Sequence, residues 1–509
     1  MRVNQLKAGA ALSYLSMAFG FIVFIVYTPF MLRYLGQSEY GLYNLVISVV
    51  SYLSLLSFGF GSAYIRFYSR FKAKEDSGNI AKLNGMFLLI FSAIGFISVV
   101  AGLCMVLNIG AVLGSQLQVS QISTAKILMS LMIVNIAFSF PSSVFHNYVM
   151  AHERYVFQKS LQLIKVVATP FITIPVLILG YKSVGVILIT VVVAIVIDIA
   201  NMLFCLRKLQ MQFSFQRFDT GLLKELTVFS SYIFMNMIID QINWNVDKFI
   251  LGRFSGTVAV AIYGLASQFN TYYLQISTSI SNVFIPRINK LVAAHNNNEE
   301  LTNLFTRIGR IQFMLLALIF TGFLFFGQSF ITLWAGAEYK ESFIITLLLL
   351  GPVTIPLIQN IGIEIQRAKN MHQFRSWVYL AIAIVNICIS IPLAKQYGGI
   401  GSALGTAISL FLGNGLIMNW YYHKRVGLNM IYFWKRIVAF FPSLVAPILF
   451  GILAYRFIDQ YNFGLLAVFG SIYCGVFGAS LWLFGMDRTE KELLLKPLRA
   501  VMGKLKATR

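Results

Sequence analysis

Long runs of apolar residues recur along the whole chain and are separated by shorter polar connections. About fourteen of these runs approach the ~20 residues that a helix needs to cross a bilayer. They cover residues 9–32, 42–65, 83–107, 127–145, 156–179, 184–206, 228–251, 259–283, 311–334, 343–365, 377–394, 400–421, 437–455 and 463–484. Because a lipid-embedded chain must satisfy its backbone internally, the pattern predicts an all-α polytopic membrane protein of about 14 transmembrane helices.

The first six runs and the next six share residues in the same order, which indicates an internal repeat. The matching positions are Arg33 and Arg253, Lys159 and Arg375, Gly185 and Gly401, and Asp198 and Asn414. Because each copy has an even number of helices, both enter from the same side of the membrane. We therefore predict two pseudo-symmetric six-helix lobes around a central cavity, at 1–210 and 211–430. Two additional transmembrane helices would follow at 431–486, and a basic cytoplasmic tail at 487–509.

The large positive charge of the chain is explained mainly by its membrane topology. The net charge is +22, with 40 Lys and Arg among 509 residues that are 58% apolar. Most of these cations lie at the termini or at even-numbered connections between the runs. This is the distribution expected of cytoplasmic segments. We therefore expect both termini in the cytoplasm and no nucleic-acid partner.

Three of the predicted helices carry polar faces. Asn236, Asp240, Asn243 and Asp247 fall on one side of the helix at 228–251, and Lys248 flanks them. A charge at the bilayer centre costs about 3 kcal/mol on insertion scales, so this stripe should face water or protein. The next helix carries Gln268 and Gln275 on its polar face. The polar band of the helix at 42–65 begins at Asn44 and reaches Arg66 just beyond it. The uncharged side chains could equally bond one helix to another.

The sequence shows no motif for ATP hydrolysis, metal binding or enzymatic catalysis. We see no Walker-type phosphate loop, and the five His residues do not form a metal-binding pattern. No predicted extracytoplasmic loop is long enough for a catalytic domain. We therefore expect no enzyme activity, no metal and no organic cofactor. The energy for transport would come from Na⁺ or H⁺ gradients or from the distribution of the substrate itself.

Four segments carry a family resemblance: RYLGQSEYGLYNL, LLSFGFGSAYIRFYSRF, NVDKFILGRFSGTVAVAIYGLASQF and YGGIGSALGTAIS. In these segments the chain resembles the Wzx-type polysaccharide flippases of the multidrug/oligosaccharidyl-lipid/polysaccharide exporter superfamily. The resemblance implies alternating access and transport of undecaprenyl-diphosphate-linked oligosaccharide from the inner to the outer leaflet of a bacterial cytoplasmic membrane. It also implies membrane lipids and neighbouring polymerases and glycosyltransferases as partners. We expect the protein to work as a monomer.

The resemblance gives the polar residues candidate roles. A diphosphate needs cations in a hydrated cavity, and Arg provides paired hydrogen bonds. The candidates for this cationic cavity are Arg66, Lys248, Arg33, Arg70, Arg253 and Arg287. The candidates for ion coupling or for the polar lining are Asp240, Asp247, Asn236, Asn243, Gln268, Gln275 and Asn44.

Two alternatives stay open. A flippase for a peptidoglycan or teichoic-acid precursor would share the same plan and is poorly separated by sequence. A multidrug/cation antiporter of the same superfamily would usually have twelve helices and an acidic pocket. The extra helix pair and the buried cations argue against it.

Overall fold

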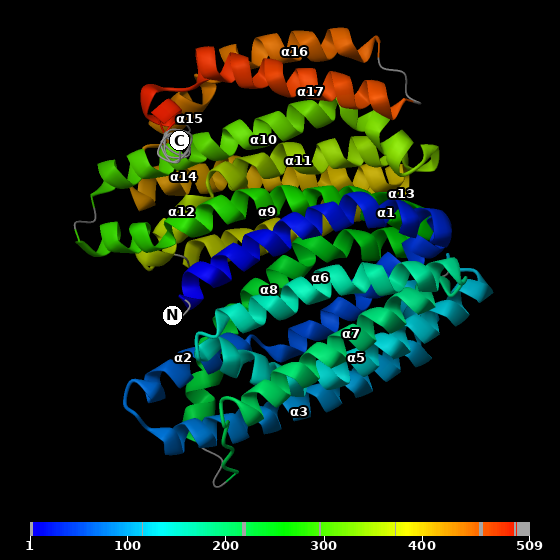
Figure 1. Ribbon diagram of the computed structural model, residues 1–509, viewed down its shortest axis with the longest axis vertical. Helices are drawn as coiled ribbons and strands as arrows, with labels where there is room; N and C mark the ends of the chain where they lie inside the picture. Colours follow the sequence, from blue (N-terminus) through cyan, green and yellow to red (C-terminus); the bar gives the residue numbers. More distant parts are fainter. Residues whose placement is uncertain are drawn as a thin grey trace, which may run out of the picture. The chain divides into compact units, whose positions relative to one another are not determined.

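The computed structural model describes residues 4–114, 116–215, 220–294, 297–371, 373–457, 462–492 and 495. Regular structure within these residues is entirely helical (Figure 1). The predicted tail at 487–509 lies largely outside them. In the first half the elements are α1 (Gln5–Ser51), η1 (Tyr52–Ser57), α2 (Phe60–Lys72), α3 (Ser77–Leu107), α4 (Ile109–Leu113), α5 (Val119–Ala151), α6 (Tyr155–Ile178), α7 (Lys182–Arg207) and α8 (Thr220–Phe254).

The second half continues with α9 (Gly256–Ala294), α10 (Asn298–Trp334), η2 (Ala337–Tyr339), α11 (Ser342–Ile358), α12 (Asn360–Ala368), α13 (Gln373–Leu410), η3 (Phe411–Met418), α14 (Asn419–Tyr421), η4 (Tyr422–Val426), α15 (Met430–Val438), α16 (Phe441–Tyr455), α17 (Phe463–Ser480) and η5 (Leu481–Gly485). Each predicted membrane segment has a helical counterpart among them. Eleven helical stretches of the described residues are long and apolar enough to cross a membrane.

The difference between eleven and fourteen has a simple structural origin. The stretches Lys7–Lys72 and Gln373–Val426 each contain two predicted segments, joined through kinks at Gly36 and Gly398. The segment at 259–283 lies in α9, which is not among the eleven stretches because polar residues interrupt it. The predicted all-α membrane fold of about 14 segments is thus confirmed.

Left-handed glycines mark equivalent points in the two halves. Gly36 has φ +71° and Gly256 has φ +82°, and each follows its matching arginine, Arg33 or Arg253, by three residues. A side chain with a Cβ rarely adopts this backbone conformation, so glycine permits the chain to turn from one membrane helix into the next. The shared break supports the internal repeat predicted from the sequence.

The segment at 42–65 is not one continuous helix. After α1 the chain tightens into the 3₁₀ turn η1, and α2 begins only at Phe60. The hydroxyls of Ser51 and Ser54 donate to the carbonyls of Ser48 and Ser51, three residues earlier. Such local bonds compete with the α-helical ladder, which explains why a simple apolar count missed the break.

The chain packs as two compact units. Unit 1 comprises Met1–Gly264 and Asn386–Ser402, and unit 2 comprises Leu265–Val385 and Ala403–Arg509. In unit 1, α3, α5 and α7 lie side by side, and α1 packs along α6 (Figure 1). In unit 2, α16 and α17 pack together and against α10. The repeat predicted a boundary at 210/211, whereas α8 packs with unit 1 and the compact units divide within α9.

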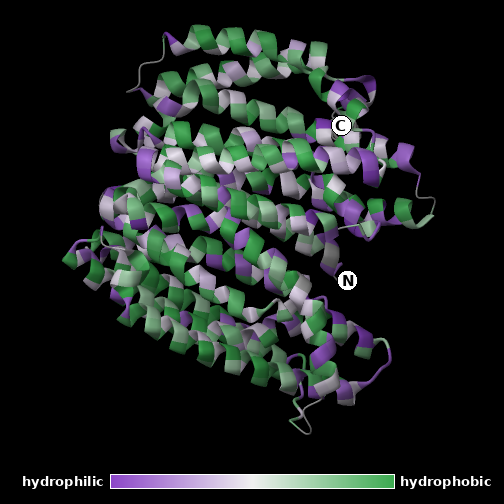
Figure 2. Ribbon diagram, turned by 180° about the vertical axis from the view of Figure 1, so that it is seen from behind, coloured by the Kyte–Doolittle hydropathy of each residue, from purple (hydrophilic) through white to green (hydrophobic). Residues whose placement is uncertain are grey.

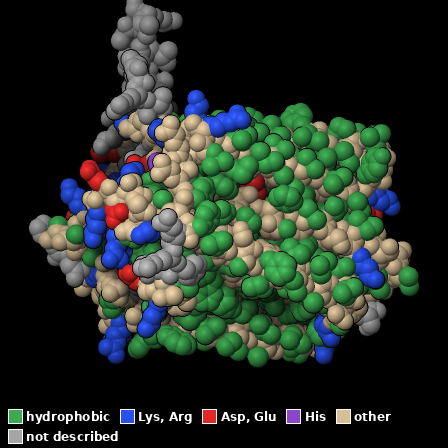
Figure 3. Space-filling model, turned by 90° about the horizontal axis from the view of Figure 1, so that it is seen from below, with side chains coloured by type: hydrophobic (Ala, Val, Ile, Leu, Met, Phe, Trp, Pro, Cys, Tyr) green, Lys and Arg blue, Asp and Glu red, His purple; other side chains and the backbone are tan. Residues whose placement is uncertain are grey.

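Apolar side chains cover the helices along their length. Hydropathy colouring shows hydrophilic residues concentrated at helix ends and connections, including the turn between α2 and α3 (Figure 2). On the face shown in Figure 3, hydrophobic side chains form a broad band, with Lys and Arg gathered at its two edges. Charges at both edges and apolar atoms between them are the arrangement expected of a multi-pass membrane protein.

Candidate functional site

The predicted polar stripe lies on a single helix, α8, but its two halves differ in exposure. Asn236 and Asp240 are exposed, whereas Asn243 and Asp247 are 9% and 2% exposed. Helical periodicity correctly placed the four residues on one side of α8. The two carboxylates of the stripe therefore lie in different environments: Asp240 is accessible and Asp247 is enclosed by protein.

Asp247 is held inside unit 1 by two hydroxyl groups. Tyr263 of α9 donates to Oδ2 at 2.6 Å, and Ser402 of α13 donates to Oδ1 at 2.7 Å. Hydrogen bonds of this length to a carboxylate are charge-assisted and stronger than neutral ones. Lys248, the next residue along α8, is only partly buried. Both carboxylate oxygens are thus oriented by named donors from other helices.

Further oxygen groups continue from Ser402. Ser390 donates its hydroxyl proton to Oδ1 of Asn386 at 2.7 Å, and the same oxygen lies 3.3 Å from the carbonyl oxygen of Ser402. Asn386, Ser390 and Ser402 are all almost fully buried, and all belong to unit 1. We call Asp247, Tyr263, Asn386, Ser390 and Ser402 the oxygen cluster. Carboxylate, hydroxyl and amide oxygens suit a hard cation or a proton, and no soft ligand is among them.

An open pocket of about 290 Å³ lies beside Asp240 on the same helix. Its walls are formed by η1 and by the middle of α8. Gln241 donates to the carbonyl of Ser51 at 2.8 Å and to Oγ of Ser54 at 3.3 Å. Asn245 donates to the side-chain oxygen of Gln241. The lining residues, which we call the Trp244 pocket, are Ser54, Leu55, Met237, Asp240, Gln241, Trp244 and Asn245.

Arg66 and Arg70 belong to α2, and both contact side chains near the beginning of α8. The guanidinium of Arg66 stacks over the ring of Phe229, 4.4 Å from its centroid. Arg70 forms an ion pair with Glu225 at 2.9 Å, with both side chains largely exposed. The charge of Arg70 is therefore already balanced by α8. Arg66 has no carboxylate partner within the part of the chain that the structure describes.

The other predicted cations of unit 1 lie far from this pair. Arg253, near the opposite end of α8, donates to the carbonyl of Ala111 at 2.9 Å. About 40 Å separates it from Glu225, given the 1.5 Å rise per helical residue. Arg33 is exposed near the kink of α1. The cations of unit 1 therefore do not form one cluster, and their contact with substrate stays a prediction.

The remaining predicted residues occupy separate places. Asn44 is buried, donates to the carbonyl of Tyr40 at 2.9 Å, and packs against Gly264, so it joins helices within unit 1. Gln268, Gln275 and Arg287 lie on the part of α9 that belongs to unit 2. Gln275 and Arg287 are exposed there. Their roles in binding stay predictions.

Sequence reasoning missed Ser390, Ser402, Gln241 and Asn245. Gln241 and Asn245 are four residues apart on α8, and they directly follow Asp240 and Trp244 in the sequence. This spacing was available as a signal for a second polar face on α8. Ser402 had no such signal, because small hydroxyl residues are common in membrane helices.

Comparison with solved structures shows which fold the chain has. A lipid II flippase MurJ in an inward closed conformation aligns with 93% of this chain and 98% of its own, at TM-score 0.70 and 16% identity. An inward-facing multidrug resistance MATE family transporter of the MOP superfamily aligns with 85% of this chain and 98% of its own, at TM-score 0.60 and 11% identity. The fold is thus that of membrane flippases and transporters.

Sequence relatives narrow the class to a family. The profile of the family described as polysaccharide biosynthesis protein matches residues 6–292, so the chain belongs to that family. The uncharacterized membrane protein EpsK of Bacillus subtilis (strain 168) is 21% identical over 487 residues, 94% of each chain. The capsular polysaccharide biosynthesis protein CapF of Staphylococcus aureus is 25% identical over 206 residues, 40% of this chain and 50% of its own.

Proposed function

We propose that this protein is a flippase that moves undecaprenyl-diphosphate-linked oligosaccharide from the inner to the outer leaflet of a bacterial cytoplasmic membrane. The observation that carries the proposal is the Trp244 pocket, which places carboxylate, amide and indole groups halfway along a membrane helix of a polysaccharide biosynthesis family member. The same fold occurs in a lipid II flippase. Alternating access would expose the pocket to each side in turn.

The chemistry of the Trp244 pocket suits a sugar. An exposed indole face can cover the apolar face of a sugar ring, while carboxylate and amide groups bind its hydroxyls. The pocket volume of about 290 Å³ lies at the lower end of the range for small-molecule sites, which favours one ring rather than a whole oligosaccharide. Because Asp240 is exposed near the centre of α8, it requires a hydrated cavity rather than lipid.

Arg66 is the cation of unit 1 that best fits the diphosphate. Its side chain is exposed, and it is held against Phe229 without a carboxylate partner among the described residues. Arg70, by contrast, is paired with Glu225. The planar fork of Arg66 can bind two phosphate oxygens at once. The isoprenoid tail would stay in the bilayer.

The oxygen cluster is the proposed coupling site for Na⁺ or H⁺. Asp247 supplies the charge, and Ser402, Tyr263, Asn386 and Ser390 supply neutral oxygens around it. Occupation by a cation would compensate a buried carboxylate that otherwise lacks water. Binding and release of that cation would then bias the inward-facing and outward-facing states.

The test is translocation of fluorescent undecaprenyl-diphosphate oligosaccharide in proteoliposomes. We expect the wild type to flip this lipid and Trp244→Ala and Arg66→Ala to lose at least about tenfold in rate, the effect of roughly 1.4 kcal/mol. Trp377→Ala and Arg207→Ala, exposed residues of α13 and α7, serve as controls and should flip normally.

Other outcomes would contradict the proposal. Preferential movement of a peptidoglycan or teichoic-acid precursor would reassign the substrate. Export of a cationic dye without movement of any lipid-linked glycan would favour the antiporter alternative. Normal flipping by both Trp244→Ala and Arg66→Ala would retain the flippase function and relocate its binding site.

A further inference from the structure

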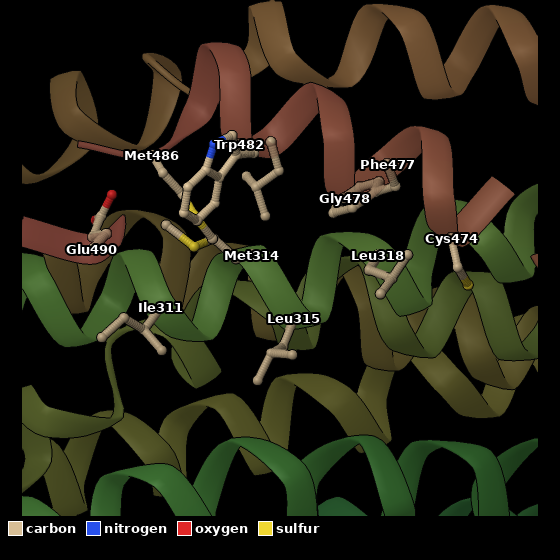
Figure 4. Close-up of a pocket in the computed structure, with 11 residues that line it drawn as sticks. Ile311, Met314, Leu315, Leu318, Cys474, Phe477, Gly478, Trp482, Met486 and Glu490 are labelled. Atoms are coloured by element: carbon tan, nitrogen blue, oxygen red, sulfur yellow. The ribbon is translucent and has the colours of Figure 1, made fainter. Parts of the chain in front are cut away.

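A long apolar groove of about 370 Å³ runs between α10 and α17 in unit 2 (Figure 4), and none of the polar site residues described above lines it. Its walls are formed by α10 on one side and by α17 and η5 on the other, with Met314, Leu315 and Leu318 opposite Phe477 and Trp482. Both helices belong to stretches that are apolar enough to cross the membrane. The groove is therefore lined almost entirely by apolar residues of membrane-spanning stretches, a lining that suits an apolar chain.

A buried ion pair closes one end of this groove. Glu490, which lines the groove, receives two hydrogen bonds from Arg310 of α10, at 2.6 and 2.8 Å. The two side chains are 4% and 3% exposed. Arg310 also donates to the carbonyls of Arg436 and Gly485. With these bonds, the turn that follows η5 is fixed against α10.

The residues around Glu490 leave an excess of positive charge at the end of the groove. Arg310 is balanced by Glu490, and Arg436 is balanced by Asp487 at 2.9 Å. Lys491 has its Nζ 5.5 Å from the ring of Trp482, which lines the groove. Lys491 and the exposed Arg488 have no ion-pair partner within the described part of the chain, and the exposed Glu492 offsets one of these two charges, which leaves one positive charge in excess. This end also coincides with the end of the apolar stretch at Gly485, where lipid headgroups begin.

We propose that the groove between α10 and α17 is a binding site for one anionic glycerophospholipid. One acyl chain lies along the groove, and the phosphate contacts Lys491, with Arg488 beside it. The net positive charge at the groove end selects an anionic headgroup over a zwitterionic one. The bound lipid stabilises the packing of α16 and α17 on α10, which is a role independent of the transported substrate.

The groove geometry offers a variant that fills it without disturbing the fold. Gly478 lines the groove, and a Cβ added to it would meet no atom within 4 Å. Gly478→Leu would therefore place a side chain where the acyl chain lies. Gly475 is equally open on the same helix but does not line the groove, so Gly475→Leu is the matched control.

The experiment measures lipid binding to the purified full-length protein by native mass spectrometry and by thermal unfolding in detergent. Phosphatidylglycerol, phosphatidylcholine with the same acyl chains, and undecaprenyl phosphate are added separately. We expect phosphatidylglycerol to bind and to raise the unfolding temperature most. Gly478→Leu should abolish this effect, and Lys491→Gln should weaken phosphatidylglycerol binding about fivefold while leaving phosphatidylcholine unchanged. Gly475→Leu should match the wild type.

Each contrary result overturns the proposal. Equal binding of the two phospholipids, unaffected by Lys491→Gln, would reduce the groove to general lipid contact. Preference for undecaprenyl phosphate would assign the groove to an isoprenoid chain. Should Gly478→Leu fail to fold while Gly475→Leu folds, the Lys491→Gln comparison still decides the headgroup preference.

Discussion

Two hydroxyl groups bind the buried carboxylate of Asp247 directly. Tyr263 and Ser402 each occupy one of its carboxylate oxygens, and both donors come from helices other than α8. Such an arrangement fixes the position of the charge while leaving the hydroxyl oxygens able to bind a cation. We infer that the charge, rather than the shape, of Asp247 is what the site requires.

Asp247→Asn tests this requirement, since it keeps the shape of the side chain and removes its charge. We expect flipping to fall at least about tenfold and its dependence on Na⁺ or pH to disappear, because the charge-assisted bonds are worth about 1.5–3 kcal/mol each. Proteoliposome assays in gradients of each ion measure both effects. Asp76→Asn, outside the membrane stretches, is the control. Retained ion dependence in Asp247→Asn would disprove the coupling role.

His152 predicts a pH dependence of stability. It follows α5, where Nδ1 lies 3.0 Å from the carbonyl of Tyr148 and Nε2 lies 2.9 Å from the hydroxyl of Tyr68. The carbonyl can only accept, so Nδ1 carries the proton and Nε2 accepts from Tyr68. Burial, reinforced by Lys72 and Arg154, lowers the pKa of His152 below its ordinary value, and the bond to Tyr148 offsets part of this.

The sign of the effect follows from this lowered pKa. As pH falls below about 6.5, the unfolded chain takes up a proton at His152 before the folded protein does, so stability is lost on acidification. We expect the unfolding temperature of the wild type to fall between about pH 7 and pH 5 more steeply than that of His152→Gln. Parallel curves for the two proteins would rule out this contribution.

The candidate site was only partly predictable from single residues. Asp240 and Asp247 stood out because charge is rare in apolar segments, and both lie at the sites described. Ser390 and Ser402 could not be predicted, since their part in the oxygen cluster depends on α13 packing beside α8 and α9 within unit 1. Arg70 was predicted as a candidate for the cationic cavity, and its ion pair with Glu225, 155 residues away along the chain, could not be predicted.

At the scale of helices, the two left-handed glycines determine where α1 ends its first membrane crossing and where α8 passes into α9. A Cβ at Gly36 or Gly256 would meet no atom within 4 Å, so only the backbone opposes a side chain there. We expect Gly36→Ala and Gly256→Ala each to destabilise the protein by about 1–2 kcal/mol. Thermal unfolding in detergent measures this. Gly110→Ala, equally open but with ordinary helical φ in α4, should cause no loss.

The ion pair of Arg310 and Glu490 connects α10 to the segment after η5. Arg310→Ala should lower stability by about 3–5 kcal/mol, because it leaves Glu490 charged and buried. The double variant Arg310→Met, Glu490→Leu removes both charges and should be less damaging than Arg310→Ala alone. Unfolding temperatures compare the two. A double variant that is more unstable than Arg310→Ala would show that the bonds of Arg310 to the backbone dominate.

The helices themselves were the most predictable feature. Apolar runs of membrane-spanning length located all fourteen segments, because lipid demands continuous apolar surface over each crossing. The break at η1 escaped prediction, since Ser51 and Ser54 form local bonds that hydropathy does not register. The structure was also needed to show that Arg66 of α2 contacts Phe229 in the first half of α8, whereas Arg253 lies near the other end of that helix.

At the scale of the whole molecule, the membrane potential should drive the proposed transport. A potential that is negative inside favours outward movement of an anion by about 2.3 kcal/mol per charge per 100 mV. We expect flipping of the diphosphate lipid to accelerate when this potential is imposed on proteoliposomes and to slow when it is reversed. A lipid analogue with a neutral head should be insensitive. Equal rates at both polarities would contradict movement of net negative charge.

The middle of α13 prevents the gene from being divided into two halves that each encode one unit. Residues 386–402 complete unit 1, although they lie in the second half of the sequence, and they bring Ser402 to Asp247. A gene cut at the codon for Gly264 would therefore yield a first fragment with no Ser402 hydroxyl for its buried carboxylate. Separate expression of the two halves should therefore not yield a complete first unit, because residues 386–402 would be encoded on the other fragment.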